Sequence, residues 1–297
     1  MSNIFYEYTS AANPDLPKIP IKQYSLALLK ENYGWIPFDL SDVLNIPYPA
    51  TGPSVLAGYL HLKGNTPFSF EPHACAMFCY VIEGEGRCTL GNEMLSLNQG
   101  DVLSLPGNRA IEFQANNTNL IIYAVNDSPL LHRLHATPTK QAFAPQHYRA
   151  AAIKKEMAKI DAEAGAHDRN RDGLIYGNNK VTLGRGMSPT IWAATILVPA
   201  GEEAMPHRHN SIAVDIVLEC SVGAFSRLGW KLDKFNQIID PVEVPWESGA
   251  VFVTPPGIWH SHHNKTTKPA LVTAVQDATL HEYLHTLDIL FTHKSEE

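Results

Sequence analysis

Short runs of apolar residues, separated by glycine, proline and asparagine, recur through most of the chain from residue 53 onward. In the first half these runs lie at 55–62, 76–82, 86–90, 101–105, 110–113 and 120–125. In the second half they lie at 190–199, 213–218, 223–230 and 271–275. Apolar runs of about 4–8 residues between turn residues are typical of β-strands, and a series of them is typical of a sandwich or small barrel. The pattern predicts an all-β fold with two such units.

Three other stretches lack this strand pattern. Residues 1–50 are mixed, with proline-bearing stretches around a short helix expected within 21–33, and they predict an arm packed over the barrels. Residues 148–164 are rich in Ala, Lys, Glu and Met, which predicts a helix inside a linker at 128–180. Leucines at 280, 284, 287 and 290 lie roughly on one stripe and predict a C-terminal helix. We therefore expect an arm (1–50), a first barrel (51–127), a helical linker (128–180) and a second barrel with the C-terminal helix (181–297).

Composition and charge exclude several classes of protein. The 297 residues are 44% hydrophobic and 18% charged, as expected for a globular chain of two medium-sized domains. A net charge of −7 argues against a nucleic acid or an anionic membrane as partner. No apolar run approaches the roughly 20 residues that cross a bilayer, and the N-terminus lacks the pattern of a secretion signal. The cysteines form no C-x-x-C pair and indicate free thiols in a reducing cytoplasm, so we expect a cytoplasmic protein: Cys75, Cys79, Cys88 and Cys220.

Histidines in the second half have the spacing of metal ligands. His207 and His209 are two positions apart, so on a strand both side chains leave the same face. His260 follows the apolar run 251–253 and the turn residues 254–257. Two histidines from one strand and a third from a distant strand of the same sheet can converge on one point. The spacing predicts a metal site of three nitrogens that leaves coordination positions open.

The same stretch resembles the two motifs of the cupin superfamily. The first motif is matched by Gly201, His207 and His209. The second motif is matched by Gly249, Pro255, Gly257, His260 and Asn264. The glutamate ligand usual in the first motif is missing, because Ala213 and Val214 stand where it would fall. This departure makes residues 201–264 similar to the gentisate 1,2-dioxygenase group of bicupins, which bind ferrous iron through three histidines.

The resemblance implies two jelly-roll-like cupin barrels with Fe(II) held by His207, His209 and His260, while Mn, Ni or Zn also suit the donors. The first barrel resembles a cupin that has lost its metal site. His73-Ala74-Cys75 stands in its His-x-His slot and Ile111 in the slot of its second-motif histidine. We therefore expect a metal-free scaffold, and a homo-oligomer that buries strand edges. A zinc site of His73, Cys75 and His61 remains the alternative.

Two further residues are predicted to face the metal. Asp215 has even spacing from His207 and His209, and His262 has the parity of His260. We expect Asp215 to act as an acid or base and His262 to hydrogen-bond a substrate or ligand. In the gentisate group an arginine that holds the substrate carboxylate stands near the position of Asp215, so an aspartate there favours a neutral or cationic group. Arg185 and Arg227 remain candidate anion binders, Arg208 is expected to point outward, and His263 is expected at a solvated strand end.

These features predict a mononuclear non-haem Fe(II) dioxygenase that acts, with O2, on a small hydroxylated aromatic or diketone-type molecule. One alternative is a metal-dependent isomerase, decarboxylase or lyase in which the metal is a Lewis acid and Asp215 is the base. Another is a non-catalytic cupin that binds a small molecule.

Two motifs match other metal sites only in part. Residues 168–175 fit the first eight positions of a calcium-binding loop, but Asn179 stands where the bidentate glutamate is needed. Residues 281–285 spell H-E-x-x-H, yet Phe291 stands six positions beyond His285, where a peptidase needs a third zinc ligand. We expect a linker turn in the first case and a packing helix in the second.

Overall fold

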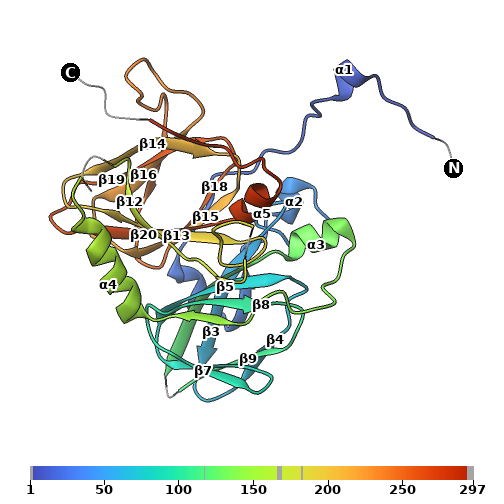
Figure 1. Cartoon of the computed structure of the whole chain (residues 1–297), viewed down its shortest axis with the longest axis vertical. Coiled ribbons are helices and arrows are strands. Elements are labelled where there is room, and N and C mark those ends of the chain that lie inside the picture. The colour runs from blue at the N-terminus through green and yellow to red at the C-terminus, as the bar shows by residue number, and fades with distance from the viewer. Residues whose placement is uncertain (1–2, 117, 166–168, 182, 293–297) are drawn as a thin grey trace.

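The computed structural model describes residues 3–116, 118–165, 169–181 and 183–292. Two antiparallel β-barrels are stacked along the long axis of the molecule, with the second barrel above the first in Figure 1. Each barrel consists of one six-stranded sheet and one smaller sheet. This architecture confirms the predicted all-β fold. No helix in the described ranges combines the length and the hydropathy needed to cross a membrane.

The first barrel has a six-stranded and a four-stranded sheet. The strands of the larger sheet are, in spatial order, β11 (Gln146–Tyr148), β8 (Val102–Pro106), β5 (Ala76–Glu83), β10 (Asn119–Asn126), β3 (Leu56–Lys63) and β2 (Gly34–Pro37). Those of the smaller sheet are β4 (Phe68–Phe70), β9 (Ile111–Ala115), β6 (Gly86–Leu90) and β7 (Glu93–Leu97).

The second barrel repeats this plan with one strand more. The strands of its larger sheet are β1 (Gln23–Tyr24), β18 (Val251–Thr254), β15 (Ala213–Glu219), β20 (Ala270–Gln276), β13 (Trp192–Val198) and β12 (Asp172–Ile175). Those of its smaller sheet are β17 (Val242–Pro245), β16 (Ala224–Gly229), β19 (Trp259–Asn264), β14 (Glu203–His209) and β21 (Ile289–Phe291). Apart from β21, every strand has a counterpart at the same place in the first barrel.

Strands from the arm and the linker join both barrels. Within the arm, β1 belongs to the second barrel and β2 to the first. Within the linker, β11 belongs to the first barrel and β12 to the second. The chain therefore crosses between the barrels twice, from β1 to β2 and from β11 to β12.

The continuous apolar runs arise because the larger sheets are buried on both faces. In β5, Met77, Cys79 and Val81 belong to the apolar cluster that fills the first barrel. The alternate residues Phe78 and Tyr80 belong to a separate cluster that also contains residues of the second barrel. The two larger sheets thus share an apolar core between the barrels, and each barrel also has a core of its own.

The helices are short and lie outside the sheets. They are α1 (Tyr8–Ala11), the 3-10 turn η1 (Leu26–Leu29), α2 (Ser41–Leu44), α3 (Ser128–Leu134), α4 (Ala150–Asp161) and α5 (Ala278–Tyr283). The helix predicted within 148–164 is confirmed as α4. The short helix predicted within 21–33 is present as the four-residue 3-10 helix η1, and the strand β1 precedes it in the same segment.

The predicted C-terminal helix is correct only in its first part. Helix α5 ends at Tyr283, and His285 has a positive φ of 57°. The chain then turns and adds β21 to the free edge of β14. Leucines at helical spacing do not reveal a neighbouring strand edge whose backbone groups are free to pair, and here that edge decides the conformation.

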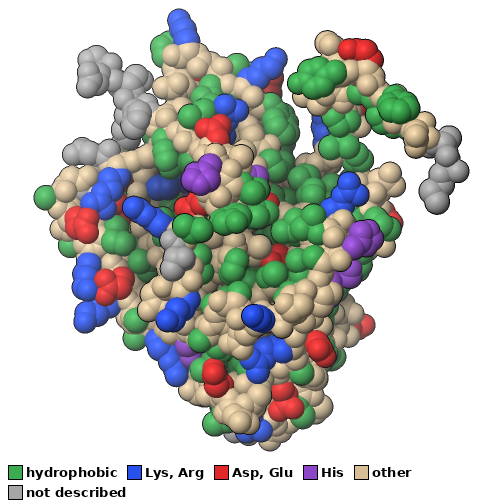
Figure 2. Space-filling view, turned by 45° about the vertical axis from the view of Figure 1, so that its right-hand side comes forward, with side chains coloured by type: hydrophobic (Ala, Val, Ile, Leu, Met, Phe, Trp, Pro, Cys, Tyr) green, Lys and Arg blue, Asp and Glu red, His purple; other side chains and the backbone are tan. Residues whose placement is uncertain are grey.

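Only the part of the arm around α1 stands away from the barrels, and it carries exposed apolar side chains (Figures 1 and 2). All four cysteines are free, as expected. Cys79 and Cys88 are buried in the first barrel, while Cys75 and Cys220 are half-buried.

Candidate metal centre

The three predicted ligands come together on two neighbouring strands of the second barrel. His207 on β14 lies opposite His260 on β19, and His209 lies two residues further along β14. One donor atom from each side chain lies within 4.8 Å of the other two, and all three side chains are buried. In the described part of the chain no other set of His, Cys, Asp or Glu side chains meets this criterion.

Hydrogen bonds to backbone carbonyls orient the three imidazoles. Nδ1 of His209 lies 2.8 Å from the Ser211 carbonyl, and Nδ1 of His260 lies 3.1 Å from the Ile258 carbonyl. Nδ1 of His207 lies 3.2 Å from the His260 carbonyl. An Nδ1–H that donates to a carbonyl leaves the Nε2 lone pair free for a metal, the usual outer-shell arrangement of metal-binding histidines. His209 Nε2 is buried and has no hydrogen-bond partner, as expected for an atom that binds a metal ion.

Burial keeps these imidazoles neutral, the state that binds metal. It lowers the pKa of His209 to about 4 and holds the pKa values of His207 and His260 well below the ordinary range. In His207 the neighbouring Arg171 cation lowers the pKa further, and in His260 the neighbouring histidines do so. The donor set therefore fits a divalent cation.

The glycine and asparagine of the second motif build the frame of the site. Gly257 has a φ of 79°, which favours glycine, and its N–H donates to the His209 carbonyl over 2.7 Å. This bond ties the turn before β19 to the end of β14. Asn264, at the end of β19, donates to the carbonyls of Val198, Pro199 and Lys268. These contacts explain why the motif residues accompany the ligands.

The ligands face a cavity of about 270 Å³ inside the second barrel. Its polar lining includes Asp215 and His262, as the parity of the strands predicts, together with Arg171. Its apolar lining includes Trp192, Ala194, Ile196, Ile289 and Phe291. Pockets for drug-sized ligands span roughly 300–1,000 Å³, so this cavity suits a small molecule.

Arg171 is the functional candidate that the sequence did not single out. Arg171, immediately before β12, and Gly173 and Ile175 within it are alternate residues that line the cavity. The guanidinium is buried, and Asn170 and the Met205 carbonyl accept hydrogen bonds from it. Among the described residues no carboxylate oxygen lies within 4.0 Å of it, and burial lowers its pKa to about 9. In the sequence, Arg171 could have been found from its i, i+2 spacing to Gly173 and Ile175. That spacing lies in a stretch that also resembles a calcium-binding loop.

Arg171 also contacts a predicted metal ligand. Its Nη1 lies 3.0 Å from Nε2 of His207 and its Nη2 lies 2.7 Å from Nδ1. A neutral imidazole has one accepting nitrogen, so with Nδ1–H donating to the His260 carbonyl only Nε2 of His207 can accept from Arg171. That lone pair can accept from Arg171 or bind a metal ion, but not both. A metal ion held at Nε2 of His207 would leave this guanidinium N–H without its histidine acceptor.

Asp215 and His262 lie in the cavity with defined partners. Thr254 Oγ1 donates to Asp215 Oδ2 over 2.5 Å, and burial raises the pKa of Asp215 to about 7 against the lowering effect of this bond and of Arg171. His262 Nδ1 lies 2.9 Å from the hydroxyl of Ser226, which also accepts from the indole N–H of Trp246. Burial holds the pKa of His262 well below the ordinary range.

Other cationic and histidine candidates lie elsewhere. Arg227 pairs with Glu243 at the surface, and Arg185 lies in a separate surface hollow with Glu282. His263 was expected at a solvated strand end, and that is wrong. It is buried on the opposite face of β19, with Nδ1 2.8 Å from a Glu203 oxygen.

In the first barrel an aromatic and an aliphatic residue occupy the ligand positions. Phe70 on β4 pairs with Ile111 on β9, as His207 pairs with His260 in the second barrel. His73 and Cys75 follow β4 instead of lying on it, so the assignment of these two residues to the ligand slot was wrong by several residues. His73 bonds the Ala136 carbonyl. Apolar side chains fill this barrel, and the alternative zinc site is not formed there.

The two partial metal motifs do not form sites in the described residues. His281 lies on α5 but His285 lies beyond its end, so they do not share a helical face. Position 168, the first ligand of the calcium-type loop, lies outside the described residues, and residues 172–175 form β12 rather than a binding loop.

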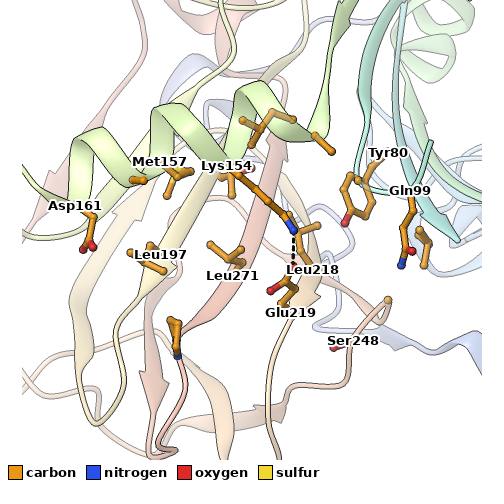
Figure 3. Close-up of a pocket in the computed structure, with 18 of the residues that line it drawn as sticks. Tyr80, Gln99, Lys154, Met157, Asp161, Leu197, Leu218, Glu219, Ser248 and Leu271 are labelled. Carbon is orange, nitrogen blue, oxygen red and sulfur yellow. Dashed lines mark ion pairs between the residues drawn. The ribbon is translucent and has the colours of Figure 1, made fainter. Parts of the chain in front are cut away.

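A larger hollow of about 1000 Å³ lies between α4 and the outer face of the second barrel. Figure 3 shows Met157 on α4 above Leu197 and Leu271, with Lys154 and Glu219 paired across one end at 3.9 Å. Strand β13 separates the two spaces, because Ala194 and Ile196 face the metal cavity while Thr195 and Leu197 face this hollow.

Comparisons with known proteins agree with this fold and site. Over 210 residues the chain is 26% identical to a gentisate 1,2-dioxygenase from Ralstonia sp, which covers 69% of this chain and 52% of the relative. Over 142 residues it is 23% identical to gentisate 1,2 dioxygenase 1 from Aquipseudomonas alcaligenes, which covers 48% of this chain and 38% of the relative. The matches thus span about half or less of these relatives' length. No family model matches the chain.

Solved structures with little sequence identity share the fold. A salicylate 1,2-dioxygenase from Pseudaminobacter salicylatoxidans superposes with a TM-score of 0.73 at 15% identity, over 96% of this chain and 93% of that one. A variant of the Bacillus subtilis oxalate decarboxylase superposes with a TM-score of 0.56 at 14% identity, over 86% and 76%. The paired barrels, the three convergent histidines and these relatives agree: the chain has the two-barrel fold of the salicylate 1,2-dioxygenase structure and is similar in sequence to gentisate 1,2-dioxygenases.

Proposed function

We propose that the chain is a mononuclear, metal-dependent ring-cleaving dioxygenase that acts on a small hydroxylated aromatic acid. The observation that carries this proposal is the convergence of His207, His209 and His260 beside a buried guanidinium in a small cavity. The gentisate 1,2-dioxygenases named above support the reaction class.

The donor set favours iron(II). Three neutral imidazoles leave the charge of a divalent ion uncompensated and leave coordination positions open. An iron(II) ion held there supplies the capacity to bind a chelating substrate and dioxygen together. Manganese, nickel and zinc also bind imidazole, so metal analysis has to decide among them.

Arg171 and Asp215 supply the polar contacts for the substrate. The guanidinium is a fork of donors that suits a carboxylate, and its burial strengthens such a pair. Asp215, with a pKa near neutrality, can accept a hydrogen bond or a proton from a phenolic hydroxyl. Asp215 alone disfavours an acidic substrate, but Arg171 places a positive charge in the same cavity. A substrate with adjacent hydroxyl and carboxylate groups therefore fits better than a neutral one.

A Lewis-acid enzyme without oxygen chemistry is the second candidate. The raised pKa of Asp215 favours it, because a carboxyl group that titrates near pH 7 serves well as a general base in isomerisation or lyase reactions.

Oxygen consumption separates the two candidates. Protein purified without oxygen and loaded with iron(II) is screened in an oxygen electrode with gentisate, salicylate, the corresponding phenols without a carboxylate, and a 1,3-diketone. We expect uptake with an aromatic acid and at least tenfold less with the matched phenol. Turnover without uptake supports the second candidate, and ligand binding without turnover supports a binding protein.

Metal analysis tests the centre itself. We expect His260→Ala to lose the bound metal while the circular dichroism spectrum is retained, since catalytic metal sites contribute less to folding than structural ones. His263→Ala, on the opposite face of the same strand, serves as the control and keeps the metal. Equal metal content in both variants contradicts the assignment.

A further inference from the structure

Strand β21 distinguishes the metal-bearing barrel from its partner. The smaller sheets of the two barrels correspond strand for strand, except that β21 extends the sheet of the second barrel beyond β14. In the described residues the first barrel has no strand outside β4, the counterpart of β14. Because the first barrel forms without such a strand, we infer that β21 has a role specific to the second barrel.

The strand lies directly against the metal-ligand strand. Phe291 pairs with His207 and Ile289 pairs with His209. Both ends of β21 are fastened. At one end the Asn210 N–H donates to the Asp288 carbonyl over 3.1 Å, and at the other the Thr292 hydroxyl donates to the Pro206 carbonyl over 2.7 Å.

Alternate side chains of β21 have different environments. Ile289 and Phe291 line the metal cavity, while Leu290 between them does not. The Phe291 ring stacks on His207, with centroids 5.7 Å apart and planes 9° from parallel, and the Arg171 guanidinium lies 5.4 Å from the ring centroid. Phe291 is nevertheless 46% exposed. It therefore stands where the buried site meets solvent.

We propose that β21 is the outer wall of the metal cavity, and that Phe291 determines which ring substituents fit and holds the Arg171 guanidinium in place. This inference rests on the proposed function for the choice of an aromatic acid as ligand. The wall itself follows from the geometry, since one aromatic ring covers a metal ligand and contacts the cation. Removing the ring opens the cavity to solvent and leaves the guanidinium without its flat support.

The test compares Phe291→Ala with Leu290→Ala in the metal-loaded protein. Leu290 is 41% exposed on the same strand, so it controls for truncation of a partly exposed apolar side chain. The first readout is the rate at which a chelator removes the metal. We expect that rate to rise at least fivefold in Phe291→Ala and to stay within about twofold of wild type in Leu290→Ala. Equal rates of metal removal in the two variants would contradict the proposal that Phe291 closes the cavity.

The second readout is ligand selectivity, measured as the ratio of affinities for hydroxybenzoates with and without a ring methyl group next to the reactive positions. We expect at least a tenfold shift toward the larger ligand in Phe291→Ala, within the roughly 10–200-fold that a methylene contributes in an apolar pocket. Thr292→Val, which loosens the end of the strand without entering the cavity, should change the chelator rate in the same direction but less. If the chelator result holds but no hydroxybenzoate binds to wild type or variant, the wall stands and the aromatic substrate of the proposed function fails. If selectivity is unchanged although hydroxybenzoates bind, Phe291 has no role in specificity.

Discussion

Arg171 is the one guanidinium among the described residues that lines the metal cavity. Among the residues that the structure describes, no carboxylate pairs with it, and burying a cation without such a partner is costly unless a ligand or other protein groups compensate the charge. Its described contacts include the Asn170 amide oxygen, the Met205 carbonyl and the rings of His207 and Phe291. We interpret the Arg171 guanidinium as the group that binds an anionic ligand.

Replacing Arg171 by Gln should weaken binding of a hydroxybenzoate by about tenfold to a hundredfold, since a hydrogen bond to a charged group contributes about 1.5–3 kcal/mol. Binding of the matched phenol should change by less than about threefold. Calorimetric titration of the metal-loaded protein measures both. Arg227→Gln is the control, because that guanidinium pairs with Glu243 at the surface. Equal loss for acid and phenol would show that Arg171 supports the fold instead.

Asp215 gives the metal-free protein a defined pH dependence. Burial raises its pKa from 3.8 to about 7, so the folded state holds this proton over a pH range in which the unfolded state releases it. Stability is therefore highest below about pH 4 as far as this group is concerned, and it falls as the pH rises toward 7. At about 1.4 kcal/mol per pKa unit, the loss is of order 4 kcal/mol.

Asp215→Asn should remove this dependence. We expect wild type and variant to have similar free energies of unfolding near pH 4, and the variant to be more stable near pH 7. Urea denaturation of the metal-free wild type and variant at several pH values measures the difference between their free energies of unfolding. The buried histidines titrate in both proteins, so their contribution cancels in this difference. Turnover should fall by about a hundredfold in the same variant if Asp215 acts as an acid or base. A pH-independent difference would place the pKa of Asp215 near its ordinary value.

At the scale of the elements, buried aspartates fasten the strand ends between the barrels. Asp127, after β10, accepts from the N–H groups of Cys75 and Ala76 and from the hydroxyl of Thr190, just before β13. Asp277, after β20, accepts from the Ile212 N–H and from a hydroxyl in the first half of the chain. The two aspartates occupy equivalent places in the two barrels, and each connects a strand of its own barrel to the other half of the molecule.

Asp127→Ala should destabilise the protein by about 2–4 kcal/mol, because it leaves buried N–H groups and a hydroxyl without an acceptor. Asp161→Ala, at the exposed end of α4, should change stability by less than about 0.5 kcal/mol. Chemical denaturation compares the two. Similar effects would mean that water or neighbouring groups replace the lost carboxylate.

At the scale of the whole molecule, the barrels share one apolar core and two buried tyrosine bridges. The Tyr123 hydroxyl donates to the Val214 carbonyl over 2.9 Å, and the Tyr59 hydroxyl donates to the Gly249 carbonyl over 2.7 Å. Strands of the arm and the linker also belong to both barrels. Neither barrel therefore has a boundary at which it could unfold alone.

We expect a single unfolding transition. Variants that retain only Trp35 in the first barrel or only Trp246 in the second should report the same midpoint in denaturant. Tyr123→Phe should lower both midpoints together, by about 1 kcal/mol in free energy. Two separate midpoints would show that the barrels are independent. The homo-oligomer expected from the sequence stays a prediction, which light scattering can test.

The sequence by itself determined the fold class and indicated the three histidines that the structure brings together. Apolar runs are a local property, and the spacing of His207, His209 and His260 with the motif glycines describes one strand pair and its turn. The inward direction of Asp215 was also expected, from its even spacing from His207 and His209, and the structure places Asp215 in the same cavity as these histidines.

Only the tertiary structure decided which segments lie beside the metal. Arg171 precedes a strand more than thirty residues before His207, and β21 reaches the site from the end of the described chain. The equivalence of Phe70 and His207 likewise appeared only when the strand pairings were known. Local patterns describe alternation within a strand, but which strand becomes a neighbour depends on burial and on free backbone hydrogen bonds at a sheet edge.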